Sequence, residues 1–334
     1  MAGALAGVCG TRLGAAGSVP QLWPGPTTFA VQLHIRRLNV PYFKRAVDAG
    51  FGAVRIPLVP WWAQHADGTW MWTNYDAMYA WLRRRGVTPL FVLQNPRDPG
   101  DIPAMIDFAR KAGARFPGAL LELGNEPDNP GQWPAFYRRP AAGLTAQSYW
   151  DIEKRFAAAW REGSPHARIA TAGTSGIDLD WQRALIDAIE RDGAFKDGTI
   201  GAIGVHAYGE RLPPHRGRRG DVIADLAALK AMLPASIDVW VTEYGLIDPR
   251  SQDVSGWFTT MDSLGVALFS WYELQDDQMD GDIQRYGLYT IDGKPKPAYD
   301  AAHAFLRART ERLESPASPT PAASRTGPGL SSNP

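Results

Sequence analysis

The chain has 334 residues, 45% of them hydrophobic and 11% aromatic, which is enough apolar material for a large buried core. Basic and acidic residues number 35 each, so the formal net charge is zero and no global field favours nucleic acid or an anionic membrane as a partner. The single cysteine, Cys9, excludes an intramolecular disulfide, and no apolar run approaches the roughly 18 residues of a membrane span.

The two ends of the chain differ in composition from its middle. Residues 1–26 are rich in Gly, Ala and Pro and lack the basic segment and sustained apolar stretch of a convincing signal peptide. Residues 314–334 are rich in Ser, Pro and Ala, which predicts a disordered tail. We therefore expect one domain at residues 27–313 between two flexible ends. We still favour a secreted or periplasmic location, since a divergent export signal or a misassigned start codon would explain the missing features.

Strand-like and helix-like segments alternate through the middle of the chain. Apolar, β-branched runs predict strands at 29–33, 53–58, 89–93, 119–123, 168–171, 200–205, 238–241 and 266–270. Each is followed by a helical pattern, at 42–49, 75–85, 103–114, 146–161, 179–191, 221–232, 255–264 and 298–309. Eight strand-then-helix units predict the α/β class and, within it, a single (β/α)8 or TIM barrel.

Two glutamates stand at the ends of two predicted strands. Glu126 follows the apolar run 120–123, and Glu243 ends the run that begins at Val239. Parallel barrels carry their chemistry where the strands open into loops at the carboxyl end. Two carboxylates that converge there suggest cleavage of a glycosidic bond, in which one protonates the leaving oxygen and the other attacks the sugar carbon.

Further polar and aromatic side chains are predicted at the same end of the barrel. Arg55 lies within the second strand, where a buried guanidinium needs an anionic partner. His206 and Tyr208 follow the sixth strand, and Trp271 follows the eighth. Taken singly, each motif has a plain structural explanation: Asn125-Glu126-Pro127 as a turn, Arg55 as a structural ion pair, and Trp271 as core. Their occurrence together at several strand ends favours the functional interpretation.

A cluster of tryptophans follows the second strand and leaves two interpretations open. Trp61, Trp62, Trp70 and Trp72 fall within a dozen residues of sequence. They suit a loop that lines the substrate, and they suit equally a loop that packs over the mouth of the barrel.

Other chemistries have no support in the sequence. The six histidines form no His-Glu-x-x-His motif and no zinc-ligand spacing, so we expect no metal. No Walker loop, nucleophile elbow or dinucleotide-binding glycine motif appears, so we expect no organic cofactor. The basic stretch 211–219 is interpreted as a solvated loop, with contact to acidic or phosphate-bearing sugars as the alternative.

Over residues 28–305 the chain resembles the retaining glycoside hydrolases of clan A, barrel enzymes that include cellulases, mannanases, xylanases and β-xylosidases. The motifs that carry this resemblance are Gly124-Asn-Glu-Pro, His206-Ala-Tyr, Thr242-Glu-Tyr-Gly, and Gly287-Leu-Tyr followed by Lys294-Pro-Lys-Pro-Ala-Tyr. The stretch 61–76, which contains Trp62, is similar to families 39 and 5 of the clan.

The resemblance implies a role for each matched residue at the two glutamates. Glu126 would be the acid/base and Glu243 the nucleophile, while Asn125 would hold the sugar 2-hydroxyl. Arg55 and Tyr208 would bond to Glu243 and keep it ionised and oriented.

The remaining matched residues would contact the sugar. His206 would line the sugar subsite or support Glu126, Trp271 would form a stacking floor, and Trp62 would bind substrate. The sequence departs from the family after the third strand, where many members carry a histidine and this chain has Gln94 and Asn95. The resemblance implies that Gln94 or Asn95 takes the place of that histidine.

The sequence thus predicts a monomeric enzyme that hydrolyses O-glycosidic bonds, with a β linkage favoured, in an oligo- or polysaccharide. It would retain the anomeric configuration through a covalent glycosyl-enzyme. Two alternatives remain: a transglycosidase, and a catalytically silent barrel that binds polysaccharide. The pattern does not indicate which sugar is cleaved, or whether cleavage is internal or terminal.

Overall fold

The computed structural model describes residues 25–37, 39–64, 67, 69–136, 144–208, 222–279 and 281–315. Residues 1–24 and 316–334, which make up most of the two predicted flexible ends, lie outside these ranges, as does the basic stretch 211–219. The expectations for those segments therefore stay predictions.

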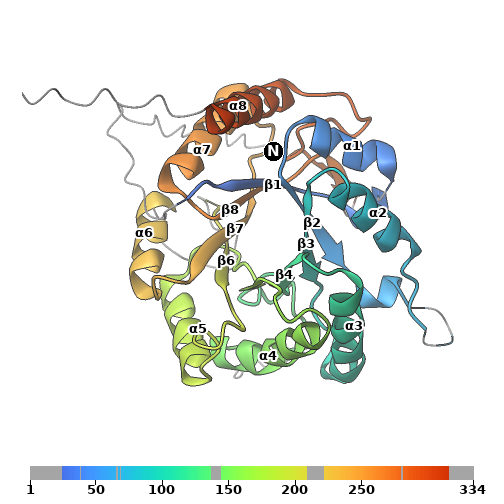
Figure 1. Ribbon diagram of the computed structural model, residues 1–334, viewed down its shortest axis with the longest axis vertical. Helices are drawn as coiled ribbons and strands as arrows, with labels where there is room; N and C mark the ends of the chain where they lie inside the picture. The colour runs from blue at the N-terminus through green and yellow to red at the C-terminus, as the bar shows by residue number, and fades with distance from the viewer. Residues whose placement is uncertain are drawn as a thin grey trace, which may run out of the picture.

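Eight parallel strands form a closed barrel in the order β1 to β8, with helices around it (Figure 1). The strands are β1 Thr28–Gln32, β2 Ala53–Leu58, β3 Thr88–Leu93, β4 Leu120–Leu123, β5 Ile169–Thr171, β6 Ala202–His206, β7 Asp238–Tyr244 and β8 Leu268–Trp271. The helices are α1 Val40–Asp48, α2 Thr73–Arg83, α3 Ile102–Arg115, α4 Ala146–Gly163, α5 Leu179–Arg191, α6 Val222–Met232, α7 Ser251–Leu264 and α8 Pro297–Glu314. The predicted (β/α)8 barrel is confirmed.

The element boundaries differ most from the prediction at the last helix and around the seventh strand. Helix α8 ends at Glu314, five residues beyond the predicted end at Arg309. Strand β7 continues to Tyr244, and α7 begins at Ser251, four residues before the predicted start at Ser255. Glu243 therefore lies inside a strand, where it pairs with His206 of β6. None of the helices in the described ranges is long and apolar enough to cross a membrane.

The inside of the barrel changes from apolar to polar along the strands. At the amino-terminal end, a small cluster of inward side chains fills the interior, made of Ala30, Ala53, Leu90, Ala170, Ala202, Trp240 and Leu268. Because strand side chains alternate, the next inward residues lie two positions further on. On β2, β4 and β7 these are Arg55, Glu122 and Thr242, all buried. Alternation thus puts polar side chains at the carboxyl end of the barrel.

A bulge in β7 turns Glu243 toward this polar end. Val241 pairs with Val205 on β6, but His206 pairs with Glu243, so β7 carries one extra residue at this point. The same irregularity appears against β8, between Val241 and Tyr244. Strict alternation would aim Glu243 at the surrounding helices. A bulge re-aims a side chain locally, and here it brings Glu243 into the barrel mouth.

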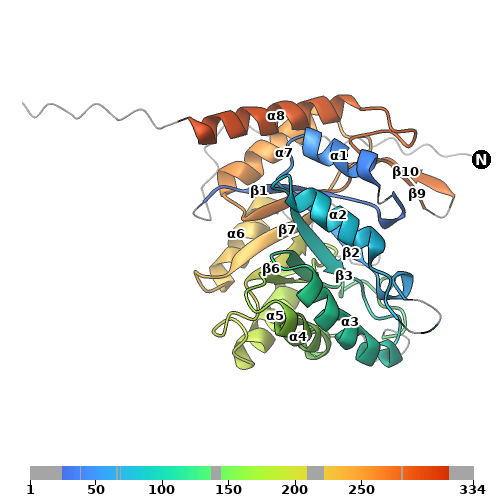
Figure 2. The same ribbon diagram turned by 45° about the vertical axis from the view of Figure 1, so that its right-hand side comes forward.

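A short hairpin follows the last barrel strand. Strands β9 Asp277–Met279 and β10 Asp282–Gln284 form an antiparallel pair before the chain enters α8. Figure 2 shows this hairpin projecting from one edge of the barrel, near α1.

Candidate active site

Arg55 joins side chains from three strands at the carboxyl end of the barrel. Its Nε donates to Glu122 Oε2 at 2.6 Å, and Nη1 donates to Gln32 Oε1 at 2.7 Å. Nη1 also forms an ion pair with Glu243 Oε1, and Nη2 donates to Asn125 Oδ1 at 3.1 Å. Asn125 therefore has its oxygen occupied, and its Nδ2 group has no hydrogen-bond partner among the described residues.

Glu122 is a second anionic partner of Arg55 that the sequence analysis missed. The carboxylate is fully buried and also accepts from the Gly173 amide at 3.0 Å and the Thr242 hydroxyl at 2.8 Å. Burial alone would raise its pKa, but the charge of Arg55 lowers the pKa to about 2. The available signal was a lone acid between Leu121 and Leu123, at an inward position of an apolar strand.

Glu243 has hydrogen-bond donors on both carboxylate oxygens. Oε1 is paired with Arg55, and Oε2 accepts from the Tyr208 hydroxyl at 3.2 Å. These are the two contacts expected from the sequence. The Glu243 side chain is 11% exposed, whereas Glu122 is 0% exposed. Glu243 is thus the anion of this network that a bound molecule can reach.

Glu126 lies in the turn that follows β4, with a left-handed φ of 45°. Few non-glycine residues adopt this region, and the turn is held there by a hydrogen bond from the Glu126 amide to Gly173 O at 2.9 Å. Oε2 accepts from Asn129 Nδ2 at 2.7 Å, and Oε1 lies 3.2 Å from His206 Nδ1. The side chain is 15% exposed, so it too is reachable.

Asn95 fixes the turn that carries Asn125 and Glu126. Its Oδ1 accepts from the Asn125 amide at 2.6 Å, and its Nδ2 donates to Asn125 O at 2.8 Å. The buried Trp133 donates from Nε1 to the same carbonyl at 2.9 Å. Of the two residues considered after the third strand, Asn95 is the one that holds the turn, and it does so through the backbone.

His206 is fully buried and lies among three carboxylates. Nδ1 is 3.2 Å from Glu126 Oε1 and 3.5 Å from Glu243 Oε2, while Nε2 is 3.8 Å from Glu122 Oε1, too far for a hydrogen bond. Burial alone would lower the imidazole pKa, but the charge of Glu243 and the contacts with Glu122 and Glu126 raise it to about 10. The imidazole is therefore protonated at neutral pH.

The protonated His206 in turn changes the pKa of Glu126. Burial raises the pKa of Glu126, but the hydrogen bond and charge of His206 outweigh this effect and hold it below its ordinary value. One ligand atom from each of Glu126, His206 and Glu243 lies within 4.8 Å of the others, a spacing that would admit a metal ion. A metal needs a neutral imidazole, so binding one here would displace the proton of His206.

Trp271 does not lie where the sequence analysis expected it. On β8, Leu268 belongs to the inner cluster, so the inward positions are 268, 270 and 272, and Trp271 faces outward. It is 0% exposed and packs against Phe258 of α7 and Tyr244, with ring centroids 6.0 and 5.9 Å away. A ring covered on this scale cannot stack on a sugar, so the expected stacking floor is wrong for Trp271.

Tyr272 takes the inward position after β8. It is partly exposed, and its hydroxyl pKa is raised by burial and then by the charges of Glu273 and Glu243. His34, in the segment after β1, packs against it with ring centroids 6.4 Å apart and forms an ion pair with the buried Glu273. The Tyr272 amide donates to Tyr244 O at 2.7 Å, so Tyr272 is an aromatic residue held next to the end of β7 that carries Glu243.

The tryptophan cluster after β2 divides into two pairs. Trp70 and Trp72 pack on Phe108 of α3, with centroids 4.7 and 4.8 Å away, and belong to the helical layer. Trp61 and Trp62 lie in the turn Pro60–Trp62 directly after β2, at the carboxyl end of the barrel. Trp62 is 47% exposed, so it is the member of the cluster with most ring surface open to a ligand.

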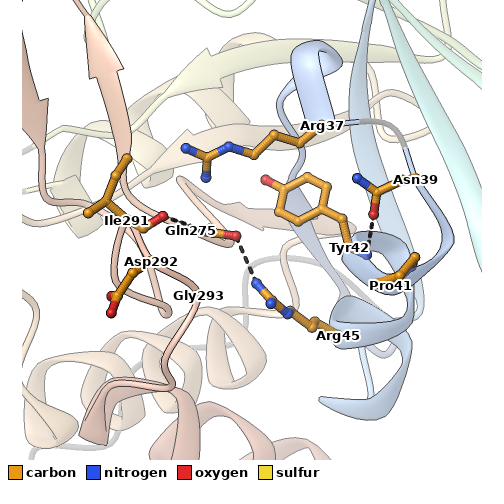
Figure 3. Close-up of a pocket in the computed structure, with 9 residues that line it drawn as sticks. All are labelled: Arg37, Asn39, Pro41, Tyr42, Arg45, Gln275, Ile291, Asp292 and Gly293. Carbon is orange, nitrogen blue, oxygen red and sulfur yellow. Dashed lines mark hydrogen bonds between the residues drawn. The ribbon is translucent and has the colours of Figure 1, made fainter.

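A separate pocket of about 190 Å³ lies between α1 and the chain that leads into α8 (Figure 3). Its lining residues are Arg37, Asn39, Pro41, Tyr42, Arg45, Gln275, Ile291, Asp292 and Gly293. Arg45 Nη1 donates to Gln275 Oε1 at 2.8 Å, and Gln275 Nε2 donates to Ile291 O at 2.9 Å. None of the predicted site residues lines this pocket. Its hydrogen bonds connect α1 to the segment before α8.

No protein-family model matches the sequence, and neither does any curated protein. Among solved structures, the chain is similar to the exo-β-1,4-mannosidase Op5Man5 from Opitutaceae bacterium strain TAV5, with 18% identity and a TM-score of 0.63. The match covers 87% of this chain and 60% of that one, so the chain spans well under two thirds of the mannosidase.

Two further solved structures are matched over most of their length. A triple mutant of an endo-β-1,4-glucanase from Xanthomonas axonopodis pv. citri has 14% identity and a TM-score of 0.62, covering 84% of this chain and 99% of that one. The family 30 subfamily 8 xylanase Xyn30A from Clostridium acetobutylicum has 16% identity and a TM-score of 0.56, covering 84% and 71%. At these identities the likeness establishes a shared fold. The expected resemblance to clan A glycoside hydrolases is confirmed at that level.

Proposed function

We propose that the protein is a retaining glycoside hydrolase that cleaves β-linked oligo- or polysaccharides. One observation carries the proposal: Glu126 and Glu243 approach each other across the barrel mouth with carboxylate oxygens within 4.8 Å. Retaining glycosidases hold their two carboxyl groups about 5–5.5 Å apart, whereas inverting enzymes need roughly 6.5–9.5 Å to admit a water. The glycosidase names of the matched structures support the same reaction class.

In the first step, a Glu243 oxygen attacks the anomeric carbon and the glycosidic C–O bond breaks. Glu126 gives a proton to the departing oxygen, which leaves as an alcohol. Arg55 and Tyr208 contact the two carboxylate oxygens of Glu243 and orient it for attack. The proton that Glu126 donates rests on His206 in the free site and crosses the 3.2 Å contact between Nδ1 and Oε1.

In the second step, water attacks the anomeric carbon of the glycosyl-enzyme. Glu126, now a carboxylate, takes a proton from that water, and the bond to Glu243 breaks. The configuration is inverted twice and therefore retained. Asn125 donates from Nδ2 to the sugar 2-hydroxyl, and Tyr272 supplies the aromatic surface beside the reacting sugar in place of Trp271. Trp62 contacts a more distant sugar.

Both carboxylates come from one chain, so a monomer suffices for the reaction. A β-linked polymer is met outside the cytoplasm, which favours a secreted or periplasmic location. No cofactor enters either step, because acid, base and nucleophile are all side chains of this chain.

The two glutamates should fail differently when each is replaced. Glu126→Ala is expected to lower kcat/KM, which reports the first step, by roughly 10²–10⁴-fold on substrates with poor leaving groups and to spare kcat/KM on activated aryl glycosides, which need little proton assistance in that step. Glu243→Ala is expected to abolish turnover of both, because no glycosyl-enzyme can form. The measurement is kcat/KM for aryl β-glycosides across a leaving-group series. Equal losses across the series in both variants would refute the assigned roles, and absence of wild-type turnover with saccharide binding intact would favour a silent binding barrel.

A further inference from the structure

Tyr286 lies at the barrel mouth and has no role in the reaction as described. Its ring packs against Tyr272, with centroids 5.5 Å apart and planes at 72°. On its other side it approaches Gly245, two residues after Glu243, so closely that a Cβ at that glycine would lie 3.2 Å from the Tyr286 ring. Tyr286 is therefore wedged between the ends of β7 and β8.

The backbone of Tyr286 is fixed from several directions. Its carbonyl accepts from Trp271 Nε1 and from the Glu273 amide, both at 3.3 Å. The preceding residue, Arg285, accepts from the Asp248 amide at 2.9 Å, which joins the hairpin to the loop after β7. A side chain carried by such a segment is preorganised, so little conformational entropy is lost when a ligand contacts it.

The phenol of Tyr286 is open to a ligand. The residue is partly exposed, and its hydroxyl has no hydrogen-bond partner among the described residues. Burial raises the pKa of the Tyr286 hydroxyl, and the charges of Glu273 and Glu243 raise it further. A pyranose has hydroxyls that accept hydrogen bonds and apolar C–H faces that stack on aromatic rings. Tyr286 offers an unpartnered hydroxyl donor and an aromatic face side by side, so it suits both.

The position of Glu126, the proposed acid, determines which part of the substrate contacts Tyr286. Glu126 protonates the leaving group, so the leaving group lies on the β4 side of the mouth. In a closed barrel of eight strands, β8 is opposite β4. The segment after β8, including Tyr286, thus faces the glycone, the part of the substrate that stays on Glu243.

We propose that Tyr286, with Tyr272, forms a second glycone subsite that holds the sugar next to the one being transferred. This inference rests on the proposed function and deepens it, because it makes a β-linked disaccharide the smallest glycone that the site fully engages. The Tyr286 ring stacks on the second sugar, and its hydroxyl donates to one of that sugar's oxygens. The enzyme therefore prefers chains over single sugars on the glycone side.

The test compares two aryl glycosides that differ only in glycone length. The probes are the 4-nitrophenyl β-glycosides of mannose, glucose and xylose and those of the matching β-1,4-disaccharides. For the sugar that is turned over best, wild type is expected to favour the disaccharide in kcat/KM. Tyr286→Ala should lose about tenfold or more of that preference, and Tyr286→Phe about three- to tenfold, as expected for a stacked ring and one hydrogen bond. The monosaccharide should be little affected by either change.

The control variant is Gln278→Ala, an exposed hairpin residue whose side chain, within the described part of the chain, bonds only to Gly281 O. It should behave as wild type on both glycosides. If Tyr286→Ala lowers both substrates alike, Tyr286 acts through Glu243 or through folding, and the subsite is refuted although the glycosidase survives. If no aryl glycoside is turned over, the proposed function fails, and calorimetric binding of the three β-1,4-disaccharides decides the inference. Binding that Tyr286→Ala weakens supports a saccharide subsite, and no binding, or binding unchanged in the variant, overturns it.

Discussion

His206 controls where the proton of the active site resides. Burial disfavours a charged imidazole, yet Glu243, Glu122 and Glu126 together raise its pKa to about 10. The imidazolium in turn lowers the pKa of Glu126. Glu126, the proposed acid, is thus ionised in the free site, and the proton is held on His206, whose Nδ1 lies 3.2 Å from Glu126 Oε1. Protons in such a coupled group belong to the group as a whole.

This arrangement predicts an unusual pH profile for kcat/KM. In wild type the stored proton is lost only as the pH approaches about 10, the imidazole pKa, so activity should persist into the alkaline range. In His206→Gln, Glu126 must keep the proton itself and releases it at a lower pH. The basic limb should therefore move down by more than about one pH unit.

A matched control for this profile is His303→Gln. His303 lies on α8, with Nδ1 near Ala49 O, and has no contact with the carboxylates of the mouth. Its profile should superimpose on that of wild type. A basic limb that stays in place or moves upward in His206→Gln would show that His206 does not supply the proton.

At the scale of the elements, Gly173 after β5 sets the spacing of the site. A Cβ at this position would overlap the His206 ring and lie 2.7 Å from Thr242 Oγ1. The backbone of Gly173 also donates to Glu122 and accepts from the Glu126 amide. One residue without a side chain thus lets β4, β6 and β7 converge.

Gly173→Ala is therefore expected to displace His206 and Thr242. Overpacking of a buried site of this kind destabilises by about 1–3 kcal/mol. We expect a lower melting temperature and a fall in kcat/KM on every substrate, whatever its leaving group or length. Gly201→Ala is the control, because its Cβ would come no closer than 3.9 Å to Ile169 O. Full activity in Gly173→Ala would contradict the close packing of these strand ends.

The bulge in β7 belongs to the same scale and was not visible in the sequence. The run Val239–Tyr244 is apolar or aromatic apart from Thr242 and Glu243, so its residue types do not reveal where one extra residue is inserted. The motif identified Glu243 correctly as a residue of the mouth. The reason it points inward is a register shift between neighbouring strands, which only the assembled sheet contains.

Over the whole molecule, the alternation of strands and helices was sufficient to predict the barrel. Eight apolar runs with eight helical patterns leave few other architectures. The residues Arg55, Asn125, Glu126, His206, Tyr208 and Glu243 come together as expected, because carboxyl ends of parallel strands share one face of a barrel. Trp62 lies at the same end, although its contact with a sugar remains a prediction.

The predictions for Trp271 and Glu122 failed for a common physical reason, because side chains of a strand alternate between the inside and the outside of the barrel. Residue type favoured Trp271 as the stacking residue. Because alternate strand residues face the same side, the inward position of Leu268 would have selected Tyr272. Glu122 was overlooked because its flanking leucines made the strand appear uniformly apolar. Tyr286 follows a hairpin whose return to the mouth depends on contacts distant in sequence, so no local pattern indicated it.

The proposed reaction requires a covalent bond between Glu243 and the sugar, and this bond can be trapped. The protein is incubated with an activated 2-deoxy-2-fluoro glycoside of its best aryl substrate. The fluorine slows both steps, and the activated leaving group restores the rate of the first step only, so the glycosyl-enzyme accumulates. Trypsin digestion and mass spectrometry then locate the label. We predict a labelled peptide 231–250, in which Glu243 is the only glutamate, with fragmentation assigning the sugar to that residue. Label on Glu126 or any other residue, or turnover with inverted product and no label, would show that Glu243 is not the nucleophile of a retaining reaction.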